Sequence, residues 1–310
     1  MSNVIASGIS AKLSDEQKRS VRENVGLGNV GNKNLIINGD MQVSQRGTSI
    51  PFGEAYTLDR WRIVGGTSPV RVASRENNTT YSTVPHSYYM KITNNGQDMY
   101  TTQRVENARQ FSGKTVTISY WVWSTTGSYT ATSGSWGNLQ SANGNHYNVS
   151  GWGGASVNVT TTPQYVTHTI DFADVSSYSH TEGDFFEWSI YHNTSNDLYL
   201  TGVQLELGSV ATPFEHRSYG EELALCQRYF QVVNISWQGY CIGNNQPLGY
   251  SMLPTLMRST PSFVKISDSY VNMNYGVGVT PSADHVKFYP TATASTMSLA
   301  NVHGTLDAEL

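Results

Sequence analysis

The chain has 310 residues with a formal net charge of −4, and only 14% of the residues are charged, against about 25% in average globular proteins. This length suits roughly two domains, and the negative charge argues against nucleic acid, which binds basic surfaces. No apolar run approaches the roughly 18 residues of a membrane-spanning helix, and Cys226 and Cys241, the two cysteines, are too few for a disulfide framework, so we expect free thiols.

Residues 1–33 are expected to form a short attachment segment. Its first residues lack the apolar core of a signal peptide. Ser14 and Gln17 have the spacing of a capping box, which predicts one short polar helix. Because the helix has few apolar positions, it needs a partner, either its own copies or another protein. The stretch "GLGNVG" follows this helix, the reverse of a dinucleotide-binding turn, and we interpret it as a flexible joint.

Residues 34–217 predict an antiparallel β-sandwich. The stretch "NLIINGDMQVSQRG" begins with a short apolar strand and turns at Asn38-Gly39. Further strand-like segments are "YTLDRWRIVGG", "SYYMKITNN", "KTVTISYWVWSTTG", "QYVTHTIDFAD", "DFFEWSIYHN" and "DLYLTGVQLELG". None is followed by an amphipathic helix, so parallel βαβ units are not expected. A two-sheet sandwich with jelly-roll topology is therefore predicted.

Residues 218–310 predict a linking helix and a small β-domain. Ser218 lies three residues before Glu221, again the spacing of a capping box, which predicts a helix over about residues 219–231. Short strand-like segments follow: "VVNISWQGYCIG", "LGYSMLP", "SFVKISDSYVNMNYG", "HVKFYPTA" and "STMSLANVHGTLDAEL". The predicted fold class is thus mainly β, with three parts along the chain.

Several stretches resemble a family of phage proteins. "NLIINGDMQVSQRGTS", "YTLDRW" and "VQLELGSVATPFEHRSYGEELALCQRYFQ" resemble a module of bacteriophage tail-fibre and receptor-binding proteins. "LPTLMRSTPSF" and "DAEL" resemble the C-terminal domain that usually follows it, and "LSDEQKRSVRENVGLG" resembles a segment near the attachment ends of phage fibres. The resemblance implies a jelly roll similar to carbohydrate-binding modules, an intertwined homotrimer and a place on the virion tail. Residues 1–33 would then dock to another tail or baseplate protein, after synthesis in the host cytoplasm.

The predicted helix carries two apolar strips. Leu223, Cys226 and Phe230 follow an i, i+3, i+7 pattern, and Leu225 with Tyr229 forms a neighbouring strip. One strip can pack on the sandwich and the other on equivalent helices across a three-fold axis, or both can pack within one chain. With the resemblance, we expect these five residues to form a trimer interface.

A run without Asp, Glu, Lys or Arg extends from Thr115 to Ile170 and contains four of the seven tryptophans. Aromatic rings stack on sugar faces, and amides bond to sugar hydroxyls. In "TVTISYWVWS", Val116, Ile118, Tyr120 and Val122 are expected on one strand face and Thr117, Ser119, Trp121 and Trp123 on the other. The candidate glycan-binding residues are Trp136, Tyr147 and Trp152, in the predicted loop 133–154, with Trp121 and Trp123. The alternative is that these rings only anchor the loop or pack beneath a cover.

Enzymatic and metal chemistry find less support in the sequence. Acidic residues cluster in "DFAD" and "TEGDFFEW", but Asp184 and Glu187 fall on opposite faces of a strand, whereas a glycosidase needs two carboxylates flanking the sugar bond. A structural calcium ion would lie near Asp40, where some sugar-binding jelly rolls hold one. Thr201 and Gly202 stand where a second acid would help, so oxygen ligands are scarce. We expect no metal and no cofactor.

The expected function is therefore a tail-fibre protein, not an enzyme, that binds a host cell-surface glycan during adsorption. Two alternatives remain open: an architectural fibre or baseplate component without a ligand, and a polysaccharide depolymerase. A competing receptor site is the C-terminal tip, where "DSYVNMNYGVG" supplies its own tyrosines. Neither nucleic acid binding nor membrane insertion is expected.

Overall fold

The structure is a computed structural model of the chain. It describes residues 33–309 except 52–54, 66–71, 141–145, 173, 176–183, 241–248 and 293–296, and it describes the backbone alone for residues 51, 55, 136–140, 146–154, 249, 273–278, 288 and 290–292. The helix predicted within residues 1–33 lies outside the described residues. Among those described, no helix is long and apolar enough to cross a membrane.

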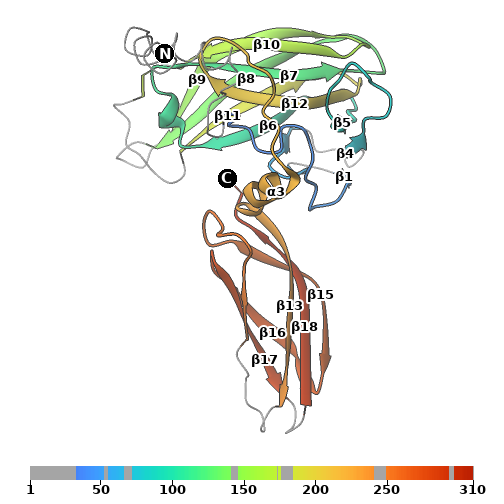
Figure 1. Cartoon of the computed structure of the whole chain (residues 1–310), viewed down its shortest axis with the longest axis vertical. Helices are drawn as coiled ribbons and strands as arrows, with labels where there is room; N and C mark the ends of the chain where they lie inside the picture. The colour runs from blue at the N-terminus through green and yellow to red at the C-terminus, as the bar shows by residue number, and fades with distance from the viewer. Residues whose placement is uncertain are drawn as a thin grey trace, which may run out of the picture.

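Two antiparallel sheets form a sandwich in the N-terminal body (Figure 1). Sheet A contains, in order, β1 (Ser49–Pro51), β4 (Val72–Asn77), β5 (Tyr88–Ile92), β12 (Leu198–Leu207), β7 (Thr115–Trp123) and β10 (Gln164–Asp171). Sheet B contains β2 (Ala55–Tyr56), β3 (Arg62–Val64), β6 (Met99–Glu106), β11 (Phe185–His192), β8 (Tyr129–Gln140) and β9 (His146–Val159). A short 3-10 helix, η1 (Ala108–Phe111), connects β6 to β7. The predicted antiparallel sandwich is confirmed.

The strand pairing is that of a jelly roll. β5 pairs with β12, β6 with β11, β7 with β10 and β8 with β9, so one long antiparallel ribbon is wound across the two sheets. Between the sheets lies one large apolar core, to which β7 contributes Val116, Ile118, Tyr120 and Val122. Trp121 and Trp123 belong to a separate cluster on the other face of β7, as the alternation of the sequence predicts.

Two local predictions about the sandwich are wrong. The apolar stretch that starts at Asn34 forms no strand, because the Asn34 side-chain oxygen accepts the backbone N–H groups of Ile36 (3.0 Å) and Leu205 (3.1 Å) in place of regular pairing. The predicted loop 133–154 is largely the β8–β9 hairpin. Glycine and asparagine are depleted in strands. Because this stretch contains many of them, its sequence did not predict two long paired strands.

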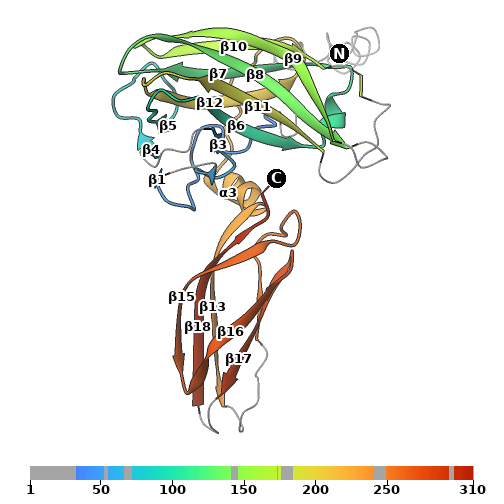
Figure 2. The same ribbon diagram turned by 180° about the vertical axis from the view of Figure 1, so that it is seen from behind.

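The C-terminal domain is built from two small sheets that enclose their own apolar core (Figure 2). One sheet, here called sheet C, has the order β13 (Phe230–Tyr240), β18 (Met297–Asp307) and β15 (Ser262–Val271). The other has the order β14 (Gly249–Met252), β17 (His285–Ala292) and β16 (Met273–Pro281).

Helix α3 (Tyr219–Gln227) lies between the sandwich and the C-terminal domain (Figures 1 and 2). The predicted capping box is confirmed, with Ser218 and Glu221 satisfying each other's backbone N–H groups. The helix ends at Gln227 and not near residue 231 as predicted. The cause is that Phe230 already pairs with Asp307 in β13 and β18, so the chain leaves the helix to enter a sheet.

Buried charges join the two domains around this helix. The Arg60 guanidinium lies 3.5 Å from the ring centre of Tyr229 and forms an ion pair with Glu309, and both charged side chains are almost fully buried. Arg46 lies 3.7 Å from the ring centre of Phe230 and binds Glu309 at 3.3 Å. We call this set of five residues the joint. Four of the stretches that carry the phage-fibre resemblance meet here, since Arg46, Arg60, Tyr229 and Glu309 each belong to a different one.

Candidate functional site

An exposed aromatic surface of the sandwich lies on the outer face of sheet A, over β7 and β10. Trp121 is half-buried and packs against Tyr165, with ring centres 5.5 Å apart. The Tyr165 side chain is 46% exposed. Thr167 and Thr169 are exposed on the same face of β10 as Tyr165 and extend this surface with two hydroxyl groups. We call these four residues the β7–β10 surface.

Trp123 is not part of this exposed surface. It is fully buried, stacked at 5.3 Å on Tyr199 and covered by Tyr81 and Tyr89 at 4.8 and 5.2 Å. Tyr81 comes from the loop between β4 and β5, so a loop covers this ring, which was the alternative open from the sequence. Among the residues that the structure describes, the Nε1 atom of Trp123 has no hydrogen-bond partner. Because a sugar cannot reach a buried ring, we assign Trp123 a packing role.

The other three predicted glycan-binding residues lie in the β8–β9 hairpin. Trp136 stands opposite Glu187 of β11 and Ser150 of β9 in the backbone pairing. Tyr147 and Trp152 belong to β9. The side chains of all three lie outside the described part of the structure, so their part in the site stays a prediction.

The five residues predicted for a trimer interface differ in how deeply the single chain buries them. Cys226, Tyr229 and Phe230 are buried within the single chain, the last two beneath the arginines of the joint. Leu223 and Leu225 are half-buried. Leu225 lines a hollow of about 490 Å³ between α3 and the loop that follows β14, where Leu256 is 61% exposed.

The acidic residues considered for hydrolysis bind neighbouring side chains. Asp171 accepts a hydrogen bond from Thr115 at 2.6 Å and Asp174 one from Ser112 at 2.8 Å. Glu187 is buried and forms an ion pair with Arg104 at 2.7 Å. Glu182 lies outside the described residues. These contacts are those of structural carboxylates.

A polar groove runs over sheet C in the C-terminal domain. It has a volume of about 320 Å³. Hydroxyl and amide side chains line it, together with one histidine: Asn234, Ser236, Ser267, Ser269, Asn301 and His303. Of the stretch predicted as a competing receptor site, only Asp268 and Ser269 line the groove, so that alternative stays a prediction.

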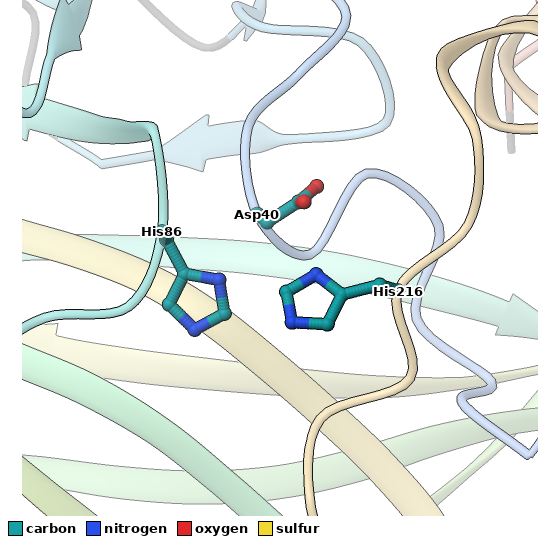
Figure 3. A group of neighbouring side chains, drawn as sticks. All are labelled: Asp40, His86 and His216. Carbon is teal, nitrogen blue, oxygen red and sulfur yellow. The ribbon is translucent and has the colours of Figure 1, made fainter.

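A cluster of potential metal ligands lies beside sheet A (Figure 3). Asp40 comes from the turn that follows Asn38, His86 from the loop before β5, and His216 from the segment that leads into α3. One oxygen and two ring nitrogens of these side chains lie within 4.8 Å of one another. Asp40 and His86 are buried, whereas His216 is exposed.

The surroundings of the cluster fix the two buried side chains. Gln42 donates a hydrogen bond to Asp40 Oδ2 at 2.7 Å. His86 lies on Gly202, which has a φ of +60°, and a Cβ atom there would stand 2.2 Å from His86 Nε2. Burial raises the pKa of Asp40. Burial, with a smaller effect of the nearby His216, lowers the pKa of His86 to about 4, so His86 is neutral near pH 7.

Sequence reasoning identified Asp40 but missed both histidines. They lie far from Asp40 along the chain, and only the fold brings the three together. The donor set does not fit calcium, which takes six to eight oxygen ligands, because two of the three side chains offer nitrogen.

Comparisons with known proteins find likeness in structure only. No family model matches the sequence, and no curated protein matches it. The enzymatically active domain of tailspike protein 4 from bacteriophage CBA120 aligns at 15% identity and a TM-score of 0.39 over 57% of this chain and 22% of its own. A carbohydrate-binding module, CBM4, aligns at 20% identity and a TM-score of 0.34 over 55% of this chain and 98% of its own. TmCBM61, solved with β-1,4-galactotriose, aligns at 12% identity and a TM-score of 0.34 over 56% and 99% of the two chains.

Proposed function

We propose that this chain is a bacteriophage tail-fibre component that binds an uncharged cell-surface glycan through the outer face of its jelly roll. The phage role rests on the sequence resemblance, four of whose stretches meet at the joint. The glycan role rests on one observation, the packing of the exposed Tyr165 on the half-buried Trp121 within a run of 56 residues that has no charged side chain.

The chemistry of the β7–β10 surface suits a sugar. Ring faces pack against the C–H faces of a pyranose, and the threonine hydroxyls beside them both donate and accept hydrogen bonds. Each stacked ring contributes about 1 kcal/mol by analogy with other aromatic contacts. Binding should depend only weakly on salt because few ion pairs contribute. Several copies on one particle would raise the effective affinity about a hundredfold or more.

Calorimetric titration of the full chain with purified surface polysaccharide tests this site. Tyr165→Ala should weaken binding at least about fivefold, which corresponds to about 1 kcal/mol. Tyr100→Ala is the matched control, because Tyr100 is 42% exposed on sheet B of the same sandwich. If both variants bind like the parent protein, the glycan is not held on the β7–β10 surface.

Two further sites compete with this surface, and each has its own variant. Replacing Trp136, Tyr147 and Trp152 together by alanine tests the β8–β9 hairpin. Asn301→Ala tests the groove on sheet C. A loss of whole-cell adsorption in only one of these folded variants would move the receptor site there.

We propose binding without hydrolysis. The carboxylates near the sandwich edge are held by Thr115, Ser112 and Arg104, which supports a structural role for them. Incubation with host polysaccharide followed by a reducing-end assay separates the two functions, since new reducing ends appear only if the protein cuts. If phage particles adsorb to cells but the isolated protein binds no sugar, the architectural alternative is favoured.

Assembly and attachment complete the proposal. We propose a homotrimer on the virion tail that uses Leu223, Leu225 and the neighbouring hollow between chains, with residues 1–33 docking to another tail protein. A variant that lacks residues 1–33 should keep its glycan binding and fail to enter particles. Normal incorporation of that variant would contradict the attachment role.

A further inference from the structure

The cluster of Asp40, His86 and His216 holds three metal-ligating side chains from three segments of the chain (Figure 3). In the figure the imidazole rings of His86 and His216 lie side by side, and the Asp40 carboxylate lies next to them. Their ring centres are 5.7 Å apart. Phe214 packs edge-on against both rings, at 4.7 and 5.0 Å. The apolar ring of Phe214 therefore covers one side of the cluster.

A buried ring nitrogen in this cluster finds no partner within the described part of the chain. His86 is 5% exposed, yet its Nδ1 atom makes no hydrogen bond to any described residue. An unsatisfied buried polar atom costs about 1–3 kcal/mol, and the fold keeps the ring in place by leaving Gly202 without a side chain beneath it. Gln42 meanwhile orients the Asp40 carboxylate, as outer-shell groups orient ligands in metal sites.

We propose that Asp40, His86 and His216 bind one divalent transition-metal ion, with Zn²⁺ as the best match. Two imidazoles and one carboxylate are the ligands of zinc sites that keep a fourth position for water. Ligand atoms around tetrahedral zinc are about 3.3 Å apart, given bonds of about 2.0–2.1 Å. The side chains need to draw together from their present spacing of up to 4.8 Å, and the exposed ring of His216 has the room to move.

The ion would tie the linking segment to the sandwich. His216 lies two residues before Ser218, the N-cap of α3, whereas His86 belongs to a loop of the sandwich and Asp40 to its first turn. A bond through the metal therefore fixes the start of the helix that carries the C-terminal domain. This proposal departs from the expectation, drawn from the sequence, that no metal binds near Asp40.

The test uses the full chain without a histidine tag, stripped with a chelator and titrated with ZnCl₂ in a calorimeter. We expect one zinc ion per chain and a melting temperature raised by several degrees, with no such effect of CaCl₂. Titration with Co²⁺ should give the visible absorption of a four-coordinate site. His216→Ala should weaken zinc binding at least about tenfold, and because this side chain is exposed the variant should fold.

His285→Ala is the matched control, since His285 is a histidine of the C-terminal domain that also lies beside a carboxylate, Asp284, at 2.7 Å. It should bind zinc like the parent protein. The proposal is overturned if the parent protein takes up no zinc, if His216→Ala binds as tightly as the parent, or if calcium stabilises the protein as well as zinc does.

Discussion

The ion pair between Arg60 and Glu309 is expected to be the strongest single tie between the two domains. The side chains are 1% and 4% exposed, so removing one charge leaves the other buried without its counter-charge. Such a loss costs about 3–5 kcal/mol. Arg60 would keep the carbonyl oxygen of Arg104 at 2.6 Å and the ring of Tyr229, and an amide in place of the acid still accepts one hydrogen bond. We therefore expect Glu309→Gln to lower the free energy of unfolding by about 2–3 kcal/mol.

Urea denaturation followed by circular dichroism measures this loss, and scanning calorimetry shows whether the domains then melt separately. Asp307→Asn is the matched control, because Asp307 binds Arg46 at 3.2 Å but its side chain is 38% exposed. An exposed pair contributes about 0–1 kcal/mol. If Glu309→Gln proves no more destabilising than Asp307→Asn, the buried pair does not hold the joint.

Three other predictions follow from the structure. Gly202→Ala should destabilise the protein by about 1–3 kcal/mol, because its Cβ would overlap His86 at a positive φ; an unchanged urea midpoint would contradict this. Burial lowers the pKa of His168 to about 4, whereas the unfolded chain titrates near 6.5. The contribution of His168 to the free energy of unfolding should thus be constant above pH 6.5 and lower by about 1–2 kcal/mol at pH 5. The variant His168→Gln should lose this part of the pH dependence. Leu225→Asp should dissociate the proposed trimer, since it buries an unpaired carboxylate; light scattering that gives the mass of one 34.1 kDa chain for the parent protein would refute the trimer itself.

Local patterns in the sequence predicted part of the regular structure, but β4, β6, β8 and β9 were not among the expected strands. The alternation in β7 correctly separated core residues such as Val116 and Ile118 from Trp121, because a strand places successive side chains on opposite faces. The capping box at Ser218 located the start of α3, because both of its hydrogen bonds join residues three positions apart.

Features that depend on distant contacts were not predictable in this way. The end of α3 is set by the pairing of Phe230 with Asp307, a residue far along the chain. The metal-ligating cluster needs the loop of His86 and the segment of His216 to meet at one turn. The burial of Trp123 depends on Tyr81 from another loop, and composition alone could not show which of two tryptophans on one strand face stays exposed.

The position of β18 has a consequence for the order in which the chain folds during synthesis. β18 leaves the ribosome after β13 and β15, yet it lies in the middle of sheet C, and both of these strands pair with it. The sandwich can fold while translation continues, as N-terminal domains generally do. Sheet C cannot form until β18 arrives, and Glu309 reaches Arg60 only then. A polypeptide released early would therefore carry a folded sandwich on an open joint, because the joint closes only after residue 309 has been translated.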